Sequence, residues 1–352
     1  MTIMWLVALP LVMAVVVLIL RQIRMLAAPL TAATLVTMAI LSISWGGERP
    51  LVLLGRSLGL LPGEAAGFAL CCALLAVLVL YGYRIPLGQT AYPLTLAAMG
   101  LLAAATLMRN TTIAGVLLEI GVLIGVLLVP SLRPGAAMTG MRVLTVVAIA
   151  APMLLLAAWA GEYLAGNPGD MVVSRIGGLA VVIGFGLALG VVPFHVWLPP
   201  VFRRANPLAI VMLSVVANWG ILLYLGSMLQ VSMWPGQQAF YAAILLAGGM
   251  VTAVAGGIMA LPQRSVHGAL AYAALADLGL VLMGLGIGTT VCVRAATLHA
   301  ALRAVGIVAV AMAAGILQHS LGGDDVEHLR GGMRRAPWTL VAMAIGGASL
   351  AW

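Results

Sequence analysis

The stretch Val191-Val192-Pro193-Phe194-His195-Val196-Trp197-Leu198-Pro199-Pro200 decides the fold of this chain. It lies inside an apolar run, residues 173–204, that is too long for one simple membrane span of about 20 residues. Pro193 has no N–H and its ring clashes with the preceding turn, so a helix should break near this residue. Broken backbone at membrane depth is tolerated only where protein or a wet cavity covers it. The stretch therefore predicts a broken transmembrane helix in a functional core.

The composition of the whole chain is that of a membrane protein. Of its 352 residues, 64% are hydrophobic and 7% are charged, and the mean hydropathy is +1.18. A soluble domain carries about 25% charged residues, so lipid must solvate most of the outer surface. The net charge of +8 comes from arginines that lie between apolar runs, which is typical of cytoplasmic loops, so we expect no nucleic-acid partner.

The apolar runs predict about twelve helices and no separate soluble domain. They are residues 3–20, 25–44, 65–83, 91–108, 111–130, 141–160, 173–204, 207–229, 238–260, 265–287, 291–318 and 336–352. Thr2–Leu20 has no basic region before it and no small-residue cleavage site, so we expect a retained first helix and not a signal peptide.

Loop arginines predict the orientation in the membrane. Eleven follow odd-numbered helices: Arg21, Arg24, Arg84, Arg133, Arg142, Arg203, Arg204, Arg264, Arg330, Arg334 and Arg335. Five lie on the opposite side: Arg49, Arg56, Arg109, Arg175 and Arg294. Because cytoplasmic loops are enriched in arginine, we expect the inner membrane of a prokaryote with the N-terminus outside.

A faint internal repeat links the fifth and tenth segments. Each carries one acid in mid-helix, Glu119 or Asp277, followed by an aliphatic residue and glycine. The two acids are five helices apart, an odd offset that gives the copies opposite topology, although apolar helices also match by chance. The predicted fold is an all-α polytopic membrane protein of about twelve helices, with inverted five-helix repeats and a broken helix 7.

Three ionisable residues lie deep inside these segments: Glu119, Asp277 and Arg303. Ionisable groups in membrane spans are costly and indicate functional sites by default. Asp277 and Arg303 lie at similar depth on adjacent antiparallel helices, so they are predicted to pair, either to fix packing or as a stepping stone for protons. Glu119 has no obvious partner and is the strongest candidate site residue.

Three histidines are further candidates, each with a structural alternative. His299 lies one turn before Arg303 and suits a proton relay or a buried structural role. His267 lies at the start of the tenth segment, and His195 follows the expected break, where it would bind water or cap exposed backbone.

No pattern in the sequence indicates a metal or cofactor. Cys71, Cys72 and Cys292 have no metal-ligand spacing and read as small buried hydrophobes. A set of polar loop residues is predicted to be solvated: His319, Asp324, Asp325, Glu327 and His328. Phosphate-loop, dinucleotide and haem motifs are absent from the sequence, so no redox chemistry is expected in this chain.

The stretch Gly190–Pro199 resembles the signature of the proton-antiporter family, which includes the large membrane subunits of respiratory complex I, multisubunit cation/proton antiporters and energy-converting hydrogenases. Further matching motifs follow the family's order over roughly residues 105–350: Leu118-Glu119, Gln263-Arg264 with Leu270–Ala274 and Asp277–Gly279, His299–Arg303, Gly322–Leu329 and Arg334–Trp338. The resemblance implies three units: 1–90 with helices 1–3, 91–230 as the first repeat, and 231–352 as a second and incomplete repeat.

The resemblance also implies a proton pathway, but with its lysines replaced. Glu119 matches a glutamate that pairs in the family with a lysine on the broken helix, and that lysine position falls on Ala188. A second basic position falls on Asn218 and a third on Arg303, and the chain contains no lysine at all. Arginine effectively never releases its proton, so the relay is predicted to be degenerate.

Two functions follow from the resemblance. The first is an antiporter-like subunit of a redox-driven complex, beside related subunits and a peripheral driving module, that conducts protons poorly or by another route. The second is a component of a redox-independent cation/proton antiporter or of a proton-driven inorganic-carbon uptake system. A degenerate scaffold with a dry interior is a third possibility.

Overall fold

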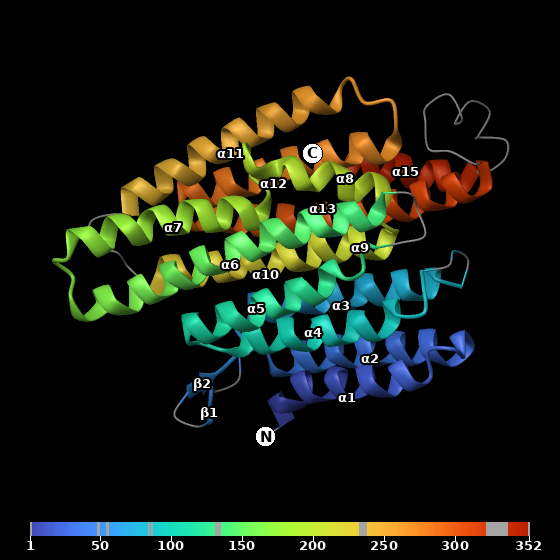
Figure 1. The fold of residues 1–352 in the computed structure, drawn as a ribbon, viewed down its shortest axis with the longest axis horizontal. Coiled ribbons are helices and arrows are strands. Elements are labelled where there is room, and N and C mark those ends of the chain that lie inside the picture. The colour runs from blue at the N-terminus through green and yellow to red at the C-terminus, as the bar shows by residue number, and fades with distance from the viewer. Residues whose placement is uncertain are drawn as a thin grey trace.

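A computed structural model describes residues 2–47, 50–53, 56–83, 85, 87–130, 135–231, 238–321 and 337–350. Nearly all of these residues lie in helices that run roughly side by side in one bundle (Figure 1). Glu48, Arg49, Arg84, Arg133, Arg330, Arg334, Arg335 and the loop residues Asp324, Asp325, Glu327 and His328 lie outside the described residues.

The twelve predicted segments are confirmed as helical. Ten of them form one helix each: α1 Trp5–Ile19, α2 Arg24–Trp45, α3 Pro62–Tyr81, α4 Ala91–Leu107, α5 Thr111–Val126, α6 Ala136–Gly166, α11 Gln238–Ala260, α12 Val266–Ile287, α13 Thr290–Leu321 and α15 Pro337–Ser349. The seventh and eighth segments are composite: α7 Met171–Leu189, η2 Phe194–Trp197 and α8 Leu198–Arg204, then α9 Pro207–Val211, η3 Met212–Ala217 and α10 Asn218–Val231. Within the described residues, eight helical stretches are long and apolar enough to cross a membrane, which makes this a multi-pass membrane protein.

The predicted break in the seventh segment is confirmed and begins before Pro193. Helix α7 ends at Leu189, and Gly190 has a φ of +71°, a left-handed conformation that glycine adopts without a steric penalty. Leu187 O accepts a hydrogen bond from Trp197 Nε1 at 3.1 Å, and Val192 N donates to Thr252 Oγ1 of α11 at 3.3 Å. Protein therefore satisfies part of the interrupted backbone, as membrane depth requires.

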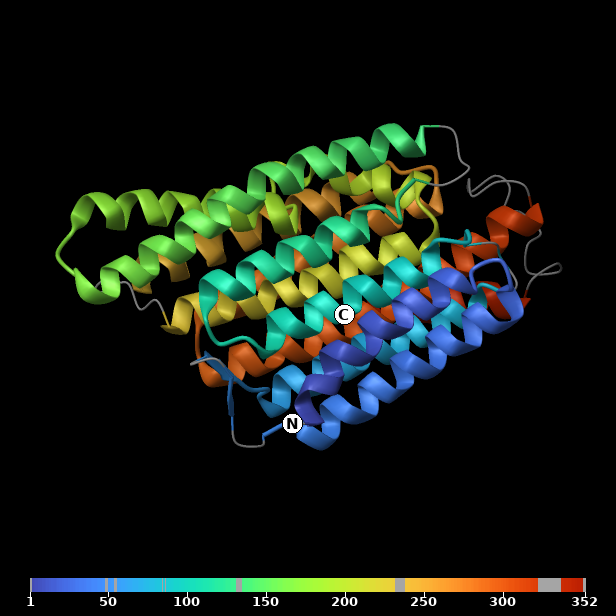
Figure 2. The same ribbon diagram turned by 60° about the horizontal axis from the view of Figure 1, so that its bottom comes forward.

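The order of packing repeats along the chain. In the first half α4 packs on α5, α5 on α6 and α6 on α7; in the second, α11 packs on α12, α12 on α13 and α13 on α15. Helices α1 and α2 add to the edge formed by α3 and α4 (Figure 2). This arrangement fits the two predicted repeats, while the unit boundaries at residues 90 and 230 stay predictions.

One short element was not predicted, an antiparallel hairpin of β1 Leu51–Leu53 and β2 Arg56–Leu58. It joins the start of α3 to the end of α4, where Gly59 N donates to Leu107 O at 3.0 Å. We call this side of the bundle, with Glu64 and Arg109, the Arg109 end. The opposite side, where α8 ends and α12 begins, is the Arg203 end.

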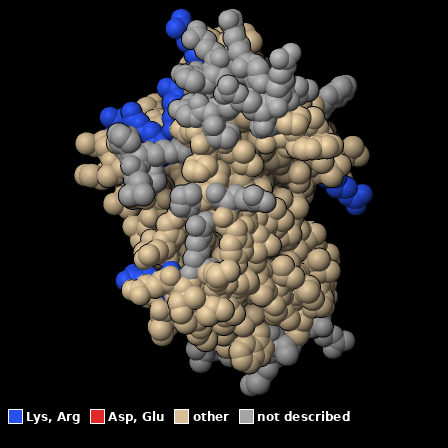
Figure 3. Space-filling view, turned by 90° about the vertical axis from the view of Figure 1, so that its right-hand side faces the viewer, with Lys and Arg blue, Asp and Glu red and all other residues tan. Residues whose placement is uncertain are grey.

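The described surface of the Arg203 end is basic. Arg203, Arg204 and Arg264 are exposed there. Figure 3, which faces this end, shows blue patches on a surface of uncharged residues and no red atom among the described residues. This distribution agrees with the loop arginines on which the predicted orientation rests.

Glycines let α11 and α12 approach closely, which gives a first testable prediction. A Cβ added at Gly279 would lie 2.4 Å from Ala253 N and 2.5 Å from Gly249 O. We expect Gly279→Ala to force the two backbones apart and to cost about 1–3 kcal/mol, seen as a lower unfolding temperature in detergent. Gly257→Ala on α11 is the matched control because a Cβ there meets nothing within 4 Å. Equal melting of both variants would contradict the expectation.

Candidate functional site

Glu119 lies on the buried face of α5, with 6% of its surface exposed. The start of α5 is fixed by Asn110, whose Oδ1 accepts from Ile113 N at 2.9 Å. Glu162 Oε1 of α6 accepts from Thr112 Oγ1 at 2.9 Å and from Asn110 Nδ2 at 3.1 Å. The helix is therefore held in a rotation that turns Glu119 away from lipid, as a functional carboxyl requires.

Tyr224 on α10 is a candidate that sequence reasoning missed. Its Oη approaches Gly115, one turn before Glu119, so closely that a Cβ there would lie 2.6 Å away. Its ring centroid lies 5.7 Å from that of Phe185 on α7. Tyr224 thus connects the Glu119 helix to the broken helix, and its buried Oη has no hydrogen-bond partner among the described residues. The sequence did not indicate this role, because a tyrosine within an apolar segment does not reveal which helices it contacts.

Arg303 is buried on α13 and is held by backbone carbonyls. Its Nη1 donates to Ser214 O at 3.0 Å, and its Nε and Nη2 donate to Ala274 O at 3.3 and 3.1 Å. The guanidinium points to these oxygens, so its predicted pairing with Asp277 is electrostatic, without a direct ion pair in the described part of the chain. Ser214 lies in the π-helix η3, whose wider turn weakens internal hydrogen bonding and leaves a carbonyl free to accept from a side chain.

Asp277 faces His299 instead of Arg303. Asp277 Oδ1 and His299 Nε2 are 3.6 Å apart, longer than a hydrogen bond, and Asp277 is only 2% exposed. Neither Asp277 Oδ2 nor His299 Nε2 has a hydrogen-bond partner in the described part of the chain. Arg303 bonds to the carbonyl three residues before Asp277, so the three candidates do lie together.

Asn218 and Trp219 are the first two residues of α10 and directly follow η3. Asn218 is 1% exposed, and neither its Nδ2 nor its Oδ1 has a protein partner among the described residues; the same holds for Trp219 Nε1. A buried amide without a hydrogen bond costs several kcal/mol in an apolar medium, roughly 2–7. Such groups are normally satisfied by buried water. Asn218 and Trp219 are therefore positions where buried water can bind.

His195 and His267 lie apart from this cluster, nearer the Arg203 end. His195 is in η2, its buried Nδ1 has no partner among the described residues, and its ring centroid lies 6.4 Å from that of Tyr272. His267 is fully buried in the first turn of α12. The two readings of these histidines, relay and structural, both stay predictions.

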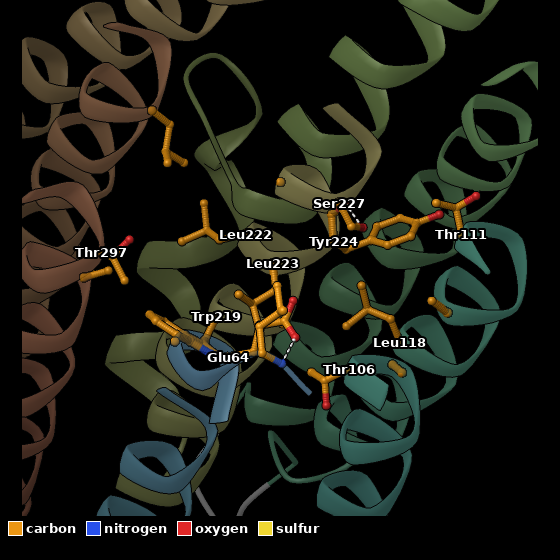
Figure 4. A pocket seen from close by; sticks show the side chains of 18 of the residues that line it. Glu64, Thr106, Thr111, Leu118, Trp219, Leu222, Leu223, Tyr224, Ser227 and Thr297 are labelled. Atoms are coloured by element: carbon orange, nitrogen blue, oxygen red, sulfur yellow. Dashed lines mark hydrogen bonds between the residues drawn. The ribbon is translucent and has the colours of Figure 1, made fainter. Parts of the chain in front are cut away.

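A cavity of about 390 Å³ begins at the Arg109 end. Its rim carries a bidentate ion pair in which Arg109 donates to both oxygens of Glu64, at 2.9 and 3.1 Å. Six helices line it: α3, α4, α5, α10, α12 and α13. In Figure 4, Trp219, Leu222, Leu223 and Tyr224 of α10 lie between Thr297 on one side and Leu118 and Thr111 on the other. The Glu119 helix and the Arg303 helix therefore flank α10 from opposite sides.

Curated relatives are similar to this chain over about half of its length. Formate hydrogenlyase subunit 3 of Escherichia coli is 32% identical over 186 residues, 47% of this chain and 29% of that protein. The A/B component of a probable K(+)/H(+) antiporter of Rhizobium meliloti is 30% identical over 162 residues, 45% of this chain and 16% of that protein. The N subunit of the NADH-quinone oxidoreductase of Moorella thermoacetica is 27% identical over 181 residues, 50% of this chain and 37% of that protein. The chain thus spans well under half the length of these relatives.

Solved structures share the fold over nearly the whole chain. The archaeal membrane-bound sulfane sulfur reductase matches with a TM-score of 0.83 and 21% identity, covering 99% of this chain and 77% of that one. Respiratory complex I from Thermus thermophilus matches with a TM-score of 0.78 and 17% identity, covering 99% and 87%.

A family match covers the break in helix 7, the Asn218 helix and the Asp277–His299–Arg303 cluster. Residues 163–351, more than half of the chain, match the transmembrane family described as NADH:quinone oxidoreductase/Mrp antiporter. The predicted resemblance is confirmed: the chain belongs to the NADH:quinone oxidoreductase/Mrp antiporter transmembrane family.

Proposed function

We propose that this chain is an antiporter-like membrane-arm subunit of a redox-driven complex that translocates protons or cations, of the NADH:quinone oxidoreductase or membrane-bound hydrogenase type. It would lie in the inner membrane of a prokaryote with its N-terminus outside. Its partners would be other membrane subunits, including related antiporter-like ones, lipid and a peripheral driving module that carries the redox centres.

The observation that carries the proposal is the set of buried polar atoms without protein partners in the described helices. Tyr224 Oη, both amide atoms of Asn218, Asp277 Oδ2 and His299 Nε2 lie at membrane depth on α10, α12 and α13. Lipid-depth polar groups persist where water or a transported ion meets them. A scaffold would replace them with well-packed apolar residues at no cost to the fold.

The route proposed here differs from a lysine relay. Ala188 carries no proton, and Arg303 keeps its charge under all ordinary conditions. We assign Arg303 the role of a fixed positive charge that acts electrostatically on the protonation of neighbouring groups. Glu119, water held by Asn218 and Tyr224, and the Asp277–His299 pair would exchange them.

Purification of the complex in mild detergent tests the assignment. We expect iron–sulfur or hydrogenase-like proteins to co-purify, and reconstituted vesicles to take up or release protons only when the redox substrate is supplied. Transport that persists without any redox partner would refute the redox-driven proposal.

A second function is favoured by the similarity to the Rhizobium meliloti antiporter and by the fold shared with the Mrp complex from Dietzia, whose TM-score is 0.77. In that case the same interior would exchange protons for cations, driven by an ion gradient alone. Proton release on addition of Na⁺ or K⁺ to purified vesicles, without redox substrate, would identify this function.

A further inference from the structure

The large cavity ends at Trp219, and a second, much smaller cavity lies directly behind this side chain. Trp219, Leu222 and Ala300 line both cavities. The small one has a volume of about 10 Å³, which is space for about one water molecule, and Arg303 and Cys71 also line it. These three shared residues therefore form a wall between an open cavity and the buried guanidinium.

Trp219 has the largest side chain of this wall, and its indole packs against Gly67 of α3. A Cβ added at Gly67 would lie 1.7 Å from Trp219 Cζ2 and 2.2 Å from Cε2. The indole edge next to Nε1 therefore lies against bare backbone, and Gly67 also lines the small cavity. Trp219 Nε1 is buried and has no protein acceptor among the described residues. Trp219, which carries this unsatisfied donor, and the charged Arg303 thus line the same one-water space.

The backbone next to Trp219 is suited to movement. Helix α10 begins immediately after the π-helix η3, Met212–Ala217, and π-turns mark places where a helix changes register at functional sites. Arg303 Nη1 is hydrogen-bonded to Ser214 O inside that same π-helix. A shift of η3 would therefore move the indole and the guanidinium together.

We propose that the large cavity is the aqueous access vestibule of the transported proton, and that Trp219 seals its inner end from Arg303. This inference rests on the proposed function and names the side on which the proton path opens to water, the Arg109 end. With the indole in place, the passage holds one water, so a proton passes along hydrogen bonds while a hydrated metal cation does not. Trp219 is a positioning residue, since it separates the vestibule from the one-water space beside Arg303 and takes up no proton itself.

Accessibility of Cys71 tests the seal without any transport measurement. The chain has three cysteines, so Cys72→Ala with Cys292→Ala leaves Cys71 alone in the wall of the small cavity. A charged, membrane-impermeant methanethiosulfonate is added from the Arg109 end to membrane vesicles that contain the assembled complex. We expect Cys71 to be protected when Trp219 is present and to react at least about tenfold faster in W219A, because a closed state leaves the open one populated at roughly 10% or less.

Three control variants and one substitute for W219A complete the design. W219F keeps most of the ring and should keep Cys71 protected; L285A trims the vestibule wall only and should do the same. A cysteine introduced by T297C, with the three native cysteines replaced by alanine, reports on the vestibule itself and should react in every background. If W219A does not assemble, G67A takes its place, because its Cβ forces the indole away from α3.

Two results would overturn the inference. Cys71 that reacts equally fast in the presence of Trp219 would show that there is no seal. Cys71 that stays protected in W219A or G67A, while T297C reacts, would show that another part of the wall closes the passage. Loss of the proposed transport function would leave the labelling result unchanged, so the two failures are distinguishable.

Discussion

Replacing Glu119 with glutamine is expected to reduce substrate-driven proton transport at least about tenfold, since a positioned proton-transfer group typically contributes 10²–10⁴-fold. Glutamine has nearly the same shape as the neutral carboxyl and can occupy the buried face of α5, where Glu119 is 6% exposed. It cannot take up or release a proton. The rate of proton uptake by sealed vesicles, followed with a pH-sensitive dye after addition of the redox substrate, measures the effect.

Glu162→Gln is the matched control because it changes a carboxyl that also contacts α5. The Glu162 side chain is exposed at the Arg109 end, and an amide oxygen can still accept from Thr112 Oγ1 and Asn110 Nδ2. We expect ordinary transport in this variant. Unchanged transport in E119Q would remove Glu119 from the pathway, and equal losses in both variants would point to a disturbed α5 instead of a lost proton carrier.

The broken helix was predictable because its cause is local. Pro193 lacks an N–H, and the run containing it exceeds one span, so the sequence alone indicates the interruption. The residue at which the break begins was less predictable. Helix α7 ends at Leu189, and the next residue, Gly190, takes a left-handed conformation three residues before the proline. The burial of Glu119 was also predictable, since a lone carboxyl in a transmembrane helix is stable only when it faces protein.

The partners of the buried charges were not predictable from the sequence. Asp277 and Arg303 lie at similar depths, which favours a pair, but depth does not reveal which backbone carbonyls are free. The π-helix that presents Ser214 O depends on how α9 and α10 are held by α13 and α5, a tertiary effect that no residue type indicates. The fit of Trp219 against Gly67 joins residues far apart in the chain and likewise has no local signal.

Arg303→Leu is expected to destabilise the protein by about 3–5 kcal/mol, the usual cost of removing one partner from a buried charge network. Leucine fills much of the same volume but removes every hydrogen bond to Ala274 O and Ser214 O. It also removes a positive charge that is held next to Asp277 by the hydrogen bond to Ala274 O. Thermal unfolding in detergent measures the loss. Arg294→Leu, on the exposed start of the same helix, is the control and should leave the unfolding temperature nearly unchanged.

Arg303→Lys separates the charge from the hydrogen-bond geometry. Lysine keeps a positive charge but cannot reproduce the planar fork that reaches the carbonyls of α12 and η3 at once. If Arg303 acts as a fixed charge, R303K should recover part of the stability lost in R303L and, because a desolvated lysine can release a proton, should make transport more dependent on pH than in the native chain. Equal stability of R303L and the native protein would mean that water already satisfies both carbonyls and Asp277, and that the guanidinium is dispensable for the fold.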